Sequence, residues 1–303
     1  MKVVVGARGS ELSRRQAEPL VACLRAAGHQ VEWRPFTTRG DRWQDGPLDK
    51  SVGTGFFTRE LEDALASGAV DLLVHSFKDV ALERPGGFVT ACVPAREDPS
   101  DWLLLRKDAP GRPRIATSSE RRLRFLRHAF PESGFTWIRG NVPTRLLRLR
   151  EGVLRGDPFH ATVMAAAGLR RLGLDLSDLD VRPIPFEILL PAPAQGAVLA
   201  ETRADRPDIV EALGPLHHAP TASCVLLERA VLAGIGGGCQ QPLGAFAELL
   251  PDGSFRLRAA YADEGGIRRG AAVGPGGADL VARVVEDLGG GGASGSPGDR
   301  RPL

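Results

Sequence analysis

Three places where a predicted strand leads into a predicted helix carry arginine together with serine or threonine. They are Ala7-Arg8-Gly9-Ser10, residues 117–122 (Thr-Ser-Ser-Glu-Arg-Arg) and residues 139–145 (Arg-Gly-Asn-Val-Pro-Thr-Arg). Free backbone N–H groups at a helix N-terminus favour anions, and the arginine fork binds carboxylates through paired hydrogen bonds. Each place alone is also typical of an ordinary helix cap with exposed arginines. Their repetition predicts a ligand with several carboxylates, held in a cleft between two lobes.

The segment from His75 to Val80 brings together a hydroxyl, an ammonium and a carboxylate in Ser76, Lys78 and Asp79. It follows an apolar strand predicted over residues 71–74, so one interpretation is a strand end with a surface lysine and aspartate. The functional interpretation places the three groups at the mouth of the same cleft, where Asp79 can stabilise a developing positive charge. We interpret His75 as structural.

One cysteine, Cys239, lies in the flexible sequence Gly236-Gly237-Gly238-Cys239-Gln240-Gln241. Most lone cysteines are buried and inert, but a cysteine in a glycine loop is accessible, which favours a modified or reactive thiol. Cys23, Cys92 and Cys224 lie in apolar patterns and are predicted to be core residues. The cysteines have no CxxC spacing, so we expect no metal site and a reducing, cytoplasmic setting.

The charge and hydropathy of the chain exclude several kinds of partner. The 39 basic and 37 acidic side chains leave a formal charge of +2, so we expect no nucleic-acid partner. We find no apolar run near the ~20 residues that a membrane span needs, so we expect no membrane partner. The start of the chain is typical of a short strand and is too short for a signal peptide.

The pattern along the 303 residues predicts α/β lobes followed by a small α+β domain. Strands are predicted over residues 3–5, 31–36, 71–75, 88–93, 102–105, 114–117, 135–138 and 162–165. Helices are predicted over residues 12–26 and 58–67 and from about residue 143. From about residue 217 we expect a helix, then strands over 244–249, 255–262 and 267–273, and a last helix over 278–288.

Two segments, residues 94–99 and 190–194, are rich in proline and are predicted to cross between the lobes. Domain 1 is therefore predicted to comprise residues 1–94 and 195–214, because the chain leaves the first lobe and returns to it. Domain 2 comprises residues 98–192, and domain 3 comprises residues 216–288. Residues 289–303 are rich in glycine, serine and proline, and we expect them to be a disordered tail.

In combination these segments resemble the porphobilinogen deaminase (hydroxymethylbilane synthase) family, in the family's order, over about residues 3–248. The runs that carry the resemblance are residues 37–41 (TTRGD), 55–62 (GFFTRELE), 74–80 (VHSFKDV), 96–99 (REDP), 117–122, 139–145, 167–173 (AGLRRLG), 195–197 (QGA) and 237–240 (GGCQ). Each run is weakly specific by itself, but nine runs in order make coincidence implausible.

The resemblance implies two lobes similar to type II periplasmic binding proteins and a small domain that carries the cysteine. It implies a transferase that condenses four porphobilinogen molecules with loss of ammonia and then releases hydroxymethylbilane by hydrolysis, in tetrapyrrole and haem biosynthesis. A dipyrromethane cofactor, bound covalently to Cys239 through a thioether, would prime the chain. Porphobilinogen carries two carboxylates, and arginine suits such a ligand.

The resemblance also implies the role of each site residue. Asp79 would be the catalytic residue, because it would face the pyrrole N–H groups and stabilise cationic intermediates. The cofactor would be bound by Cys239, Ser76, Lys78, Thr117, Ser119, Arg121, Arg122 and Arg145. The substrate and the growing chain would be bound by Arg8, Ser10, Phe57, Arg139, Arg145, Arg171 and Gln195.

Three positions depart from the family's pattern: Thr54 replaces a common lysine, Ala81 a usual proline and Ala194 a usual glycine. Thr54 puts a cationic role of its loop in doubt, whereas the other two are predicted to act on the backbone alone.

The alternative function is a non-catalytic two-lobed binding protein for a polycarboxylate ligand. It would need neither Asp79 nor a cysteine in a glycine loop. We expect a monomer.

Overall fold

The computed structural model describes residues 1–38, 58–237 and 241–289. Its helices and strands are, in order, β1 Lys2–Arg8, α1 Glu11–Ala26, β2 Gln30–Phe36, α3 Arg59–Ala66, β3 Leu72–Ser76, η1 Phe77–Asp79, β4 Phe88–Cys92, β5 Asp101–Arg106, β6 Arg114–Ala116, α4 Glu120–Ala129, β7 Gly134–Thr136, α5 Val142–Glu151, β8 Val153–Leu154, β9 Asp157–Pro158, β10 Ala161–Ala165, α6 Ala166–Leu172, β11 Leu179–Pro183, β12 Val198–Arg203, α7 Pro207–Leu213, η2 Gly214–Leu216, α8 Ala219–Gly234, β13 Leu243–Leu249, β14 Phe255–Asp263, β15 Gly266–Gly274 and α9 Ala278–Asp287.

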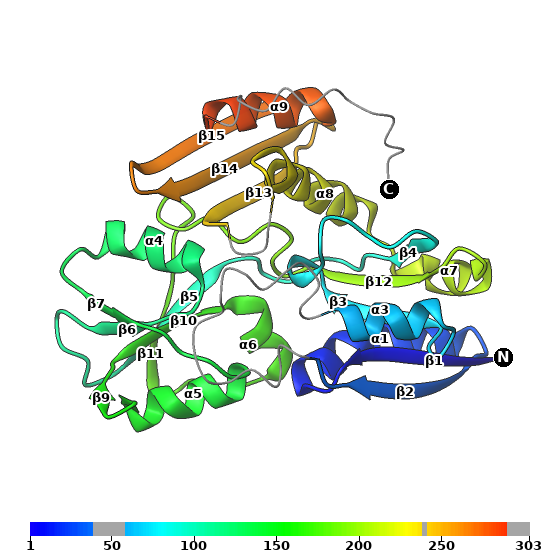
Figure 1. Ribbon diagram of the computed structural model, residues 1–303, viewed down its shortest axis with the longest axis horizontal. Coiled ribbons are helices and arrows are strands. Elements are labelled where there is room, and N and C mark those ends of the chain that lie inside the picture. The colour runs from blue at the N-terminus through cyan, green and yellow to red at the C-terminus, as the bar shows by residue number, and fades with distance from the viewer. Residues whose placement is uncertain (39–57, 238–240, 290–303) are drawn as a thin grey trace.

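The first lobe is a five-stranded sheet in the order β2-β1-β3-β12-β4. Strands β1, β2 and β3 are parallel, and β12 is antiparallel to β3 and β4. Apolar side chains of α1 and α7 pack in one buried cluster of this sheet, and those of α3 pack in another. Because β12 follows all the strands of the second lobe, the chain leaves the first lobe after β4 and returns to it (Figure 1).

The second lobe is a five-stranded sheet in the order β11-β5-β10-β6-β7. Neighbouring residues of β5 point to opposite faces, as the pleat of a strand requires. Leu103 and Leu105 pack with Phe125 of α4, and Leu104 packs with Leu146 of α5. The lobe therefore has α4 on one face and α5 on the other.

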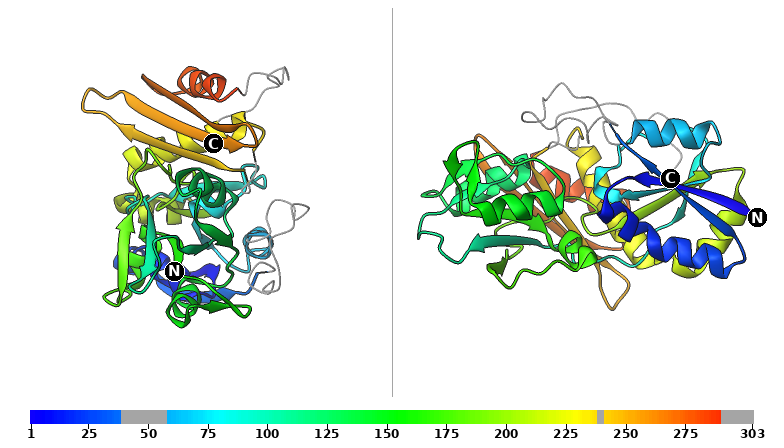
Figure 2. Two further views of the ribbon diagram at one scale, coloured as in Figure 1. Left: turned by 90° about the vertical axis from the view of Figure 1, so that its left-hand side faces the viewer. Right: turned by 90° about the horizontal axis from the view of Figure 1, so that it is seen from below.

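The small third domain is the antiparallel sheet β13-β14-β15 with two helices, α8 and α9. Leu257 and Ala259 of β14 pack with these helices, whereas Ala260 and Ala262 pack against the core of the second lobe. The three parts are seen in Figure 1, and Figure 2 shows the small domain from two further sides. The predicted fold class, two α/β lobes with a small C-terminal α+β domain, is confirmed.

The predicted strands and helices overlap the observed ones, but some elements were not predicted. The missed elements include β12, β11 and the short helix α6, which follows β10 without a break. Cys92 and Cys224 are buried, as predicted, whereas Cys23 is only half-buried against the core of the first lobe. The predicted disordered tail lies outside the described residues from residue 290 onward.

A buried ion pair joins the segments that cross between the lobes to the small domain. Arg96 lies in the first crossing and donates to both carboxylate oxygens of Glu228 in α8, at 2.6 and 3.0 Å. Glu228 is fully buried and also accepts a hydrogen bond from the backbone N–H of Ala194 at 2.7 Å, in the second crossing. The small domain is therefore bonded to both crossings through one carboxylate.

Ala194 adopts a left-handed backbone conformation with φ 61° and is fully buried. This conformation is about 1–2 kcal/mol less favourable for a residue with a Cβ than for glycine. Replacement by glycine recovers only part of that free energy, because the unfolded chain with glycine has more conformational freedom to lose on folding. We therefore expect Ala194→Gly to raise the free energy of unfolding, by at most about 1 kcal/mol, and to raise the melting temperature. Ala64→Gly, inside α3, should instead lower stability by roughly 0.5–1 kcal/mol. A lower melting temperature for Ala194→Gly would contradict the prediction.

Candidate active site

The catalytic aspartate predicted from the sequence lies in a short turn that directly follows β3. Residues 77–79 form the 3₁₀ turn η1, in which Phe77 is buried and Lys78 and Asp79 are half-buried. Before the turn, the hydroxyl of Ser76 accepts a hydrogen bond from Gln16 Nε2 at 2.8 Å. Lys78 Nζ donates to Gln195 Oε1 at 3.3 Å, so the turn is bonded to the residue that directly follows the second crossing segment.

The ammonium of Lys78 is surrounded by charged groups of both lobes. Burial lowers the pKa of Lys78 to about 8, and Asp79 opposes this shift, whereas Arg122 adds to it. The charge of Asp79 also acts on Arg145, whose pKa burial and Arg122 lower to about 10. Lys78, Asp79, Arg122 and Arg145 therefore lie close enough to affect one another electrostatically, although they come from three separate segments.

The two arginines at the start of α4 are buried rather than exposed. Arg121 and Arg122 are 4% and 7% exposed, so the alternative of an ordinary cap with exposed arginines is wrong here. Ser119 caps the helix by accepting a hydrogen bond from the Arg122 N–H at 3.4 Å. Thr117 is buried, and its Oγ1 accepts a hydrogen bond from the Ser119 N–H at 3.3 Å.

Asp101, the first residue of β5, joins these groups and was not among the site residues predicted from the sequence. Its fully buried carboxylate accepts hydrogen bonds from Arg121 Nη2 at 2.7 Å and from Arg122 Nη2 at 2.6 Å. It also accepts one from Gln195 Nε2 at 3.0 Å. Burial by itself would raise the pKa of Asp101, but the two guanidinium groups outweigh it and hold the pKa at about 2. The only sequence signal was an acidic residue at the start of an apolar strand.

We call these residues the Asp101 cluster: Asp101, Lys78, Asp79, Arg121, Arg122, Arg145 and Gln195. Hydrogen bonds join Lys78 to Gln195, and join Gln195, Arg121 and Arg122 to Asp101. The charge of Asp79 acts on Lys78 and Arg145, which connects these two residues to the rest. Among the described residues, its cations outnumber its carboxylates. Buried cations in excess are stabilised by an anionic ligand, so the cluster fits a group that carries carboxylates.

The third arginine site lies beside the cluster, at the start of α5. Asn141 caps this helix by accepting a hydrogen bond from the Thr144 N–H at 2.9 Å. Arg145 Nε donates to the carbonyl of Gly140 at 2.7 Å. Arg139 is buried, which lowers its pKa, and its charge acts on Arg145. The structure therefore brings the second and third arginine sites together.

Two further predicted substrate residues lie at the return from the second lobe to the first. Gln195 is 1% exposed, and its Nε2 donates to the carbonyl of Pro99 at 2.8 Å. Arg171 of α6 donates to the carbonyl of Gly196 at 2.8 Å, and burial lowers its pKa. Gln195 is therefore bonded to the first crossing segment, and Arg171 to the chain just after the second.

The first arginine site lies at the end of β1. Arg8 is half-buried, and Ser10 caps α1 by accepting a hydrogen bond from the Ser13 N–H at 3.2 Å. A cavity of about 320 Å³ opens here, lined by Gly9, Ser10, Glu11, Arg14, Trp33 and Pro35. The hydroxyl of Ser10 thus bonds within its own helix, and not to the Asp101 cluster.

Phe57 and Cys239 lie outside the described residues, as does Thr54. On the near side of Cys239, the N–H of Gly237 donates to the carbonyl of Leu232 at 2.9 Å. On the far side, the hydroxyl of Tyr261 donates to Gln241 Oε1 at 3.0 Å. The described structure therefore fixes the chain on both sides of Cys239 to the small domain.

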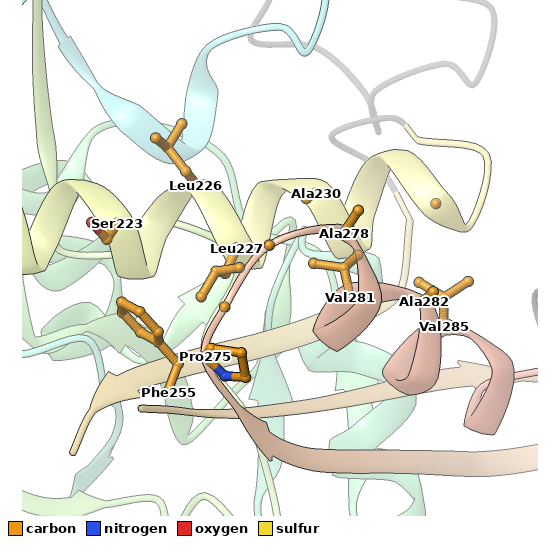
Figure 3. Close-up of a pocket in the computed structure, with 13 residues that line it drawn as sticks. Ser223, Leu226, Leu227, Ala230, Phe255, Pro275, Ala278, Val281, Ala282 and Val285 are labelled. Atoms are coloured by element: carbon orange, nitrogen blue, oxygen red, sulfur yellow. The ribbon is translucent and has the colours of Figure 1, made fainter. Parts of the chain in front are cut away.

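A larger cavity, of about 660 Å³, lies between α8 and α9 and is shown in Figure 3. Its lining is apolar, with Leu226, Leu227, Phe255 and Val281 among its side chains, and the hydroxyl of Ser223 is its polar group. Such a lining does not suit a ligand with several carboxylates. Within the described ranges, no group of three acidic, histidine or cysteine side chains is placed to hold a metal ion, and no helix is long and apolar enough to cross a membrane.

Comparison with known proteins gives matches along most of the chain. The family described as "Porphobilinogen deaminase, dipyromethane cofactor binding domain" matches residues 3–211, and "Porphobilinogen deaminase, C-terminal domain" matches residues 222–286. A porphobilinogen deaminase from Ralstonia nicotianae is 45% identical over 278 residues, which cover 89% of this chain and 81% of that protein. One from Nitratidesulfovibrio vulgaris strain Miyazaki F is 41% identical over 305 residues, covering 94% of each.

Among solved structures, a nutrient-binding protein from Burkholderia cenocepacia bound to methionine covers 73% of this chain and 93% of its own, with a TM-score of 0.41 and 14% identity. A periplasmic substrate-binding protein of an ABC transporter from Coxiella burnetii covers 73% and 94%, with a TM-score of 0.40 and 16% identity. Because both TM-scores lie below 0.5, neither bears on the ligand. The family matches cover both lobes and the small domain, and by them this chain belongs to the porphobilinogen deaminase family.

Proposed function

We propose that this chain is the transferase that condenses four porphobilinogen molecules with release of ammonia and then frees hydroxymethylbilane by hydrolysis, in tetrapyrrole and haem biosynthesis. The observation that carries the proposal, in a chain of this family, is the Asp101 cluster. It combines buried cations, which suit carboxylates, with Asp79, whose charge acts on Lys78 and Arg145. A site of this kind can bind an anionic substrate and also stabilise positive charge on it.

Cys239 would hold the family's dipyrromethane cofactor through a thioether. The acetate and propionate groups of the cofactor would be bound by Ser76, Lys78, Thr117, Ser119, Arg121, Arg122 and Arg145. When bound, this group supplies a primer whose terminal pyrrole offers the nucleophilic carbon for chain growth. Asp101 would act as a positioning residue, because it fixes the guanidinium groups of Arg121 and Arg122 before any ligand arrives.

Asp79 would act on the substrate as ammonia leaves. Breaking the carbon–nitrogen bond leaves the electron pair on nitrogen and a positive charge on the pyrrole. A carboxylate in a partly buried site stabilises such a charge more strongly than water does. The incoming substrate would be bound by Arg8, Ser10, Phe57, Arg139, Arg145, Arg171 and Gln195, with the guanidinium groups on its carboxylates. These side chains would thereby hold the reacting carbon in place.

The alternative function is a non-catalytic binding protein for a polycarboxylate ligand. An assay of the products formed from porphobilinogen distinguishes it from the transferase. Incubating the purified chain with porphobilinogen should release four ammonia molecules for each hydroxymethylbilane formed. A binding protein would retain porphobilinogen unchanged and release no ammonia. Ammonia and bilane measured in the same sample therefore decide between the two functions.

Replacing Arg139 and replacing Arg122 are expected to impair the enzyme at different steps, substrate binding and cofactor assembly. Loss of a charge-assisted hydrogen bond costs about 1.5–3 kcal/mol, so Arg139→Leu should lower kcat/KM about 10- to 100-fold or more while the protein keeps its cofactor. Arg122→Leu should instead give largely cofactor-free protein. Intact mass and steady-state turnover of both variants check this. Two variants with normal cofactor and normal turnover would show that the assignment is wrong.

We also propose that the protein is a cytoplasmic monomer without nucleic-acid or membrane partners. The formal charge of +2 supports the absence of a nucleic-acid partner. The free thiols of Cys23, Cys92 and Cys224 support a reducing compartment. The domain boundaries remain those proposed from the sequence: residues 1–94 with 195–214, 98–192 and 216–288.

A further inference from the structure

An arginine of the small domain donates hydrogen bonds to backbone carbonyl groups of the turn that carries Lys78 and Asp79. Arg229 lies in α8 and is 6% exposed. Its Nη1 donates to the carbonyls of Phe77 and Val80 at 3.3 and 3.0 Å, and its Nη2 donates to the carbonyl of Ala81 at 2.8 Å. One guanidinium group therefore binds backbone on both sides of Asp79.

The turn has little hydrogen bonding of its own to hold this shape. Within η1, the N–H of Val80 donates to the carbonyl of Phe77 at a rather long 3.3 Å. Buried carbonyl groups need partners, and a planar guanidinium fixes several of them in one geometry because its N–H groups are rigid. The N–H of Phe77 donates to the carbonyl of Ala197 at 3.1 Å and holds the start of the turn. Arg229, which is distant in sequence, holds the carbonyl groups on both sides of Asp79.

Apolar contacts extend the same interface along α8. Phe77 and Val80 pack in one cluster with Val225, and the guanidinium of Arg229 lies 4.9 Å from the centre of the Phe77 ring. Beyond the turn, Leu82 packs against the core of the small domain. A Cβ added to Gly237 would lie 2.5 Å from Leu82 Cδ1, so the chain just after α8 lies against the segment that follows Asp79.

We propose that Arg229 is a positioning residue for catalysis, which fixes the Asp79 turn relative to α8 and so to the small domain. This inference rests on the role proposed for Asp79. Bonds to backbone carbonyls alone could equally serve stability, and Arg203 provides the comparison. Arg203 donates to the carbonyls of Leu65 and Val70 in the first lobe, outside the Asp101 cluster.

The test compares Arg229→Met, Arg229→Lys and Arg203→Met with the wild type and with Asp79→Asn. Cofactor content is measured by intact mass, and kcat is expressed per cofactor-loaded enzyme. A misplacement of about 1 Å can cost on the order of 100-fold in rate, so Arg229→Met should lower kcat about 10- to 100-fold. KM should change little, because the arginines proposed to bind substrate are intact. Arg229→Lys should recover part of kcat, and Arg203→Met should keep the wild-type value.

A wild-type kcat for Arg229→Met would overturn the inference, as would an equal loss of kcat in Arg203→Met. A rise in KM at unchanged kcat would also overturn it, because that would place Arg229 in substrate binding. If Arg229→Met does not fold, Arg229→Lys decides by the same criteria, with kcat below wild type as the supporting result. Failure of the proposed function is separate: it would appear as no release of ammonia and bilane by the wild type. Normal turnover by Asp79→Asn would instead remove the role proposed for Asp79, whatever the Arg229 variants do.

Discussion

Replacing Asp79 by asparagine is expected to lower kcat at least about 100-fold while the protein still folds. The amide keeps the shape of the side chain and removes its charge. Preorganised electrostatic groups of this kind contribute about 3–4 kcal/mol to a transition state, which corresponds to roughly 10²–10³ in rate. The carboxylate oxygens could also accept the ring proton that a new carbon–carbon bond displaces, which would increase the loss.

Three other acidic side chains, Asp101, Asp98 and Glu62, are already bonded to protein partners. Asp101 is bonded to Arg121 and Arg122, and Asp98 accepts a hydrogen bond from the Ser100 N–H at 2.9 Å and pairs with Arg170 at 3.1 Å. Glu62 is paired with Arg84. Asp79 is the acid whose charge acts on both Lys78 and Arg145, so it is best placed to face a substrate cation.

Asp79→Glu is the matched control, because it keeps the charge and moves it by one methylene group. We expect it to retain more activity than Asp79→Asn. Both variants need a melting curve, to show folding, and an intact mass, to show that the cofactor is present. An asparagine variant with kcat near that of the wild type would mean that another group stabilises the cation.

Replacing Cys239 by serine is expected to abolish turnover, which is the largest effect in this account. The variant lacks the thiol that would hold the primer, and serine forms no thioether. Cys23→Ser is the matched control: its Sγ donates to the carbonyl of Ala212 at 3.2 Å, a bond that a serine hydroxyl can also make. That variant should turn over like the wild type. Full activity of Cys239→Ser would show that turnover does not need this thiol.

Elements with a clear local pattern could be predicted from the sequence. Residues 255–259 of β14 alternate apolar and polar side chains, and α9 begins and ends within a residue of its predicted range. Strand β12 was missed, although it lies inside the first sheet and pairs with β3 and β4. Its partners precede it by more than 100 residues in the sequence, and local patterns contain no information on pairing at that distance.

In the candidate site too, residues that form a local pattern could be predicted, and residues that only the fold brings together could not. The arginine and serine residues at strand ends could be found because each site is local in the sequence. Asp101 could not be found, because its importance comes from Arg121, Arg122 and Gln195, which only the fold brings to it. Arg229 was missed for the same reason: its partners are carbonyl groups, which every residue has.

The intact mass of the purified wild-type protein shows directly whether Cys239 carries a covalent primer. The mass should exceed the sequence mass by two porphobilinogen-derived pyrrole units. The increment should be present in Cys23→Ser and absent in Cys239→Ser. Active enzyme with the unmodified sequence mass would contradict the claim that a covalent primer on Cys239 starts each chain.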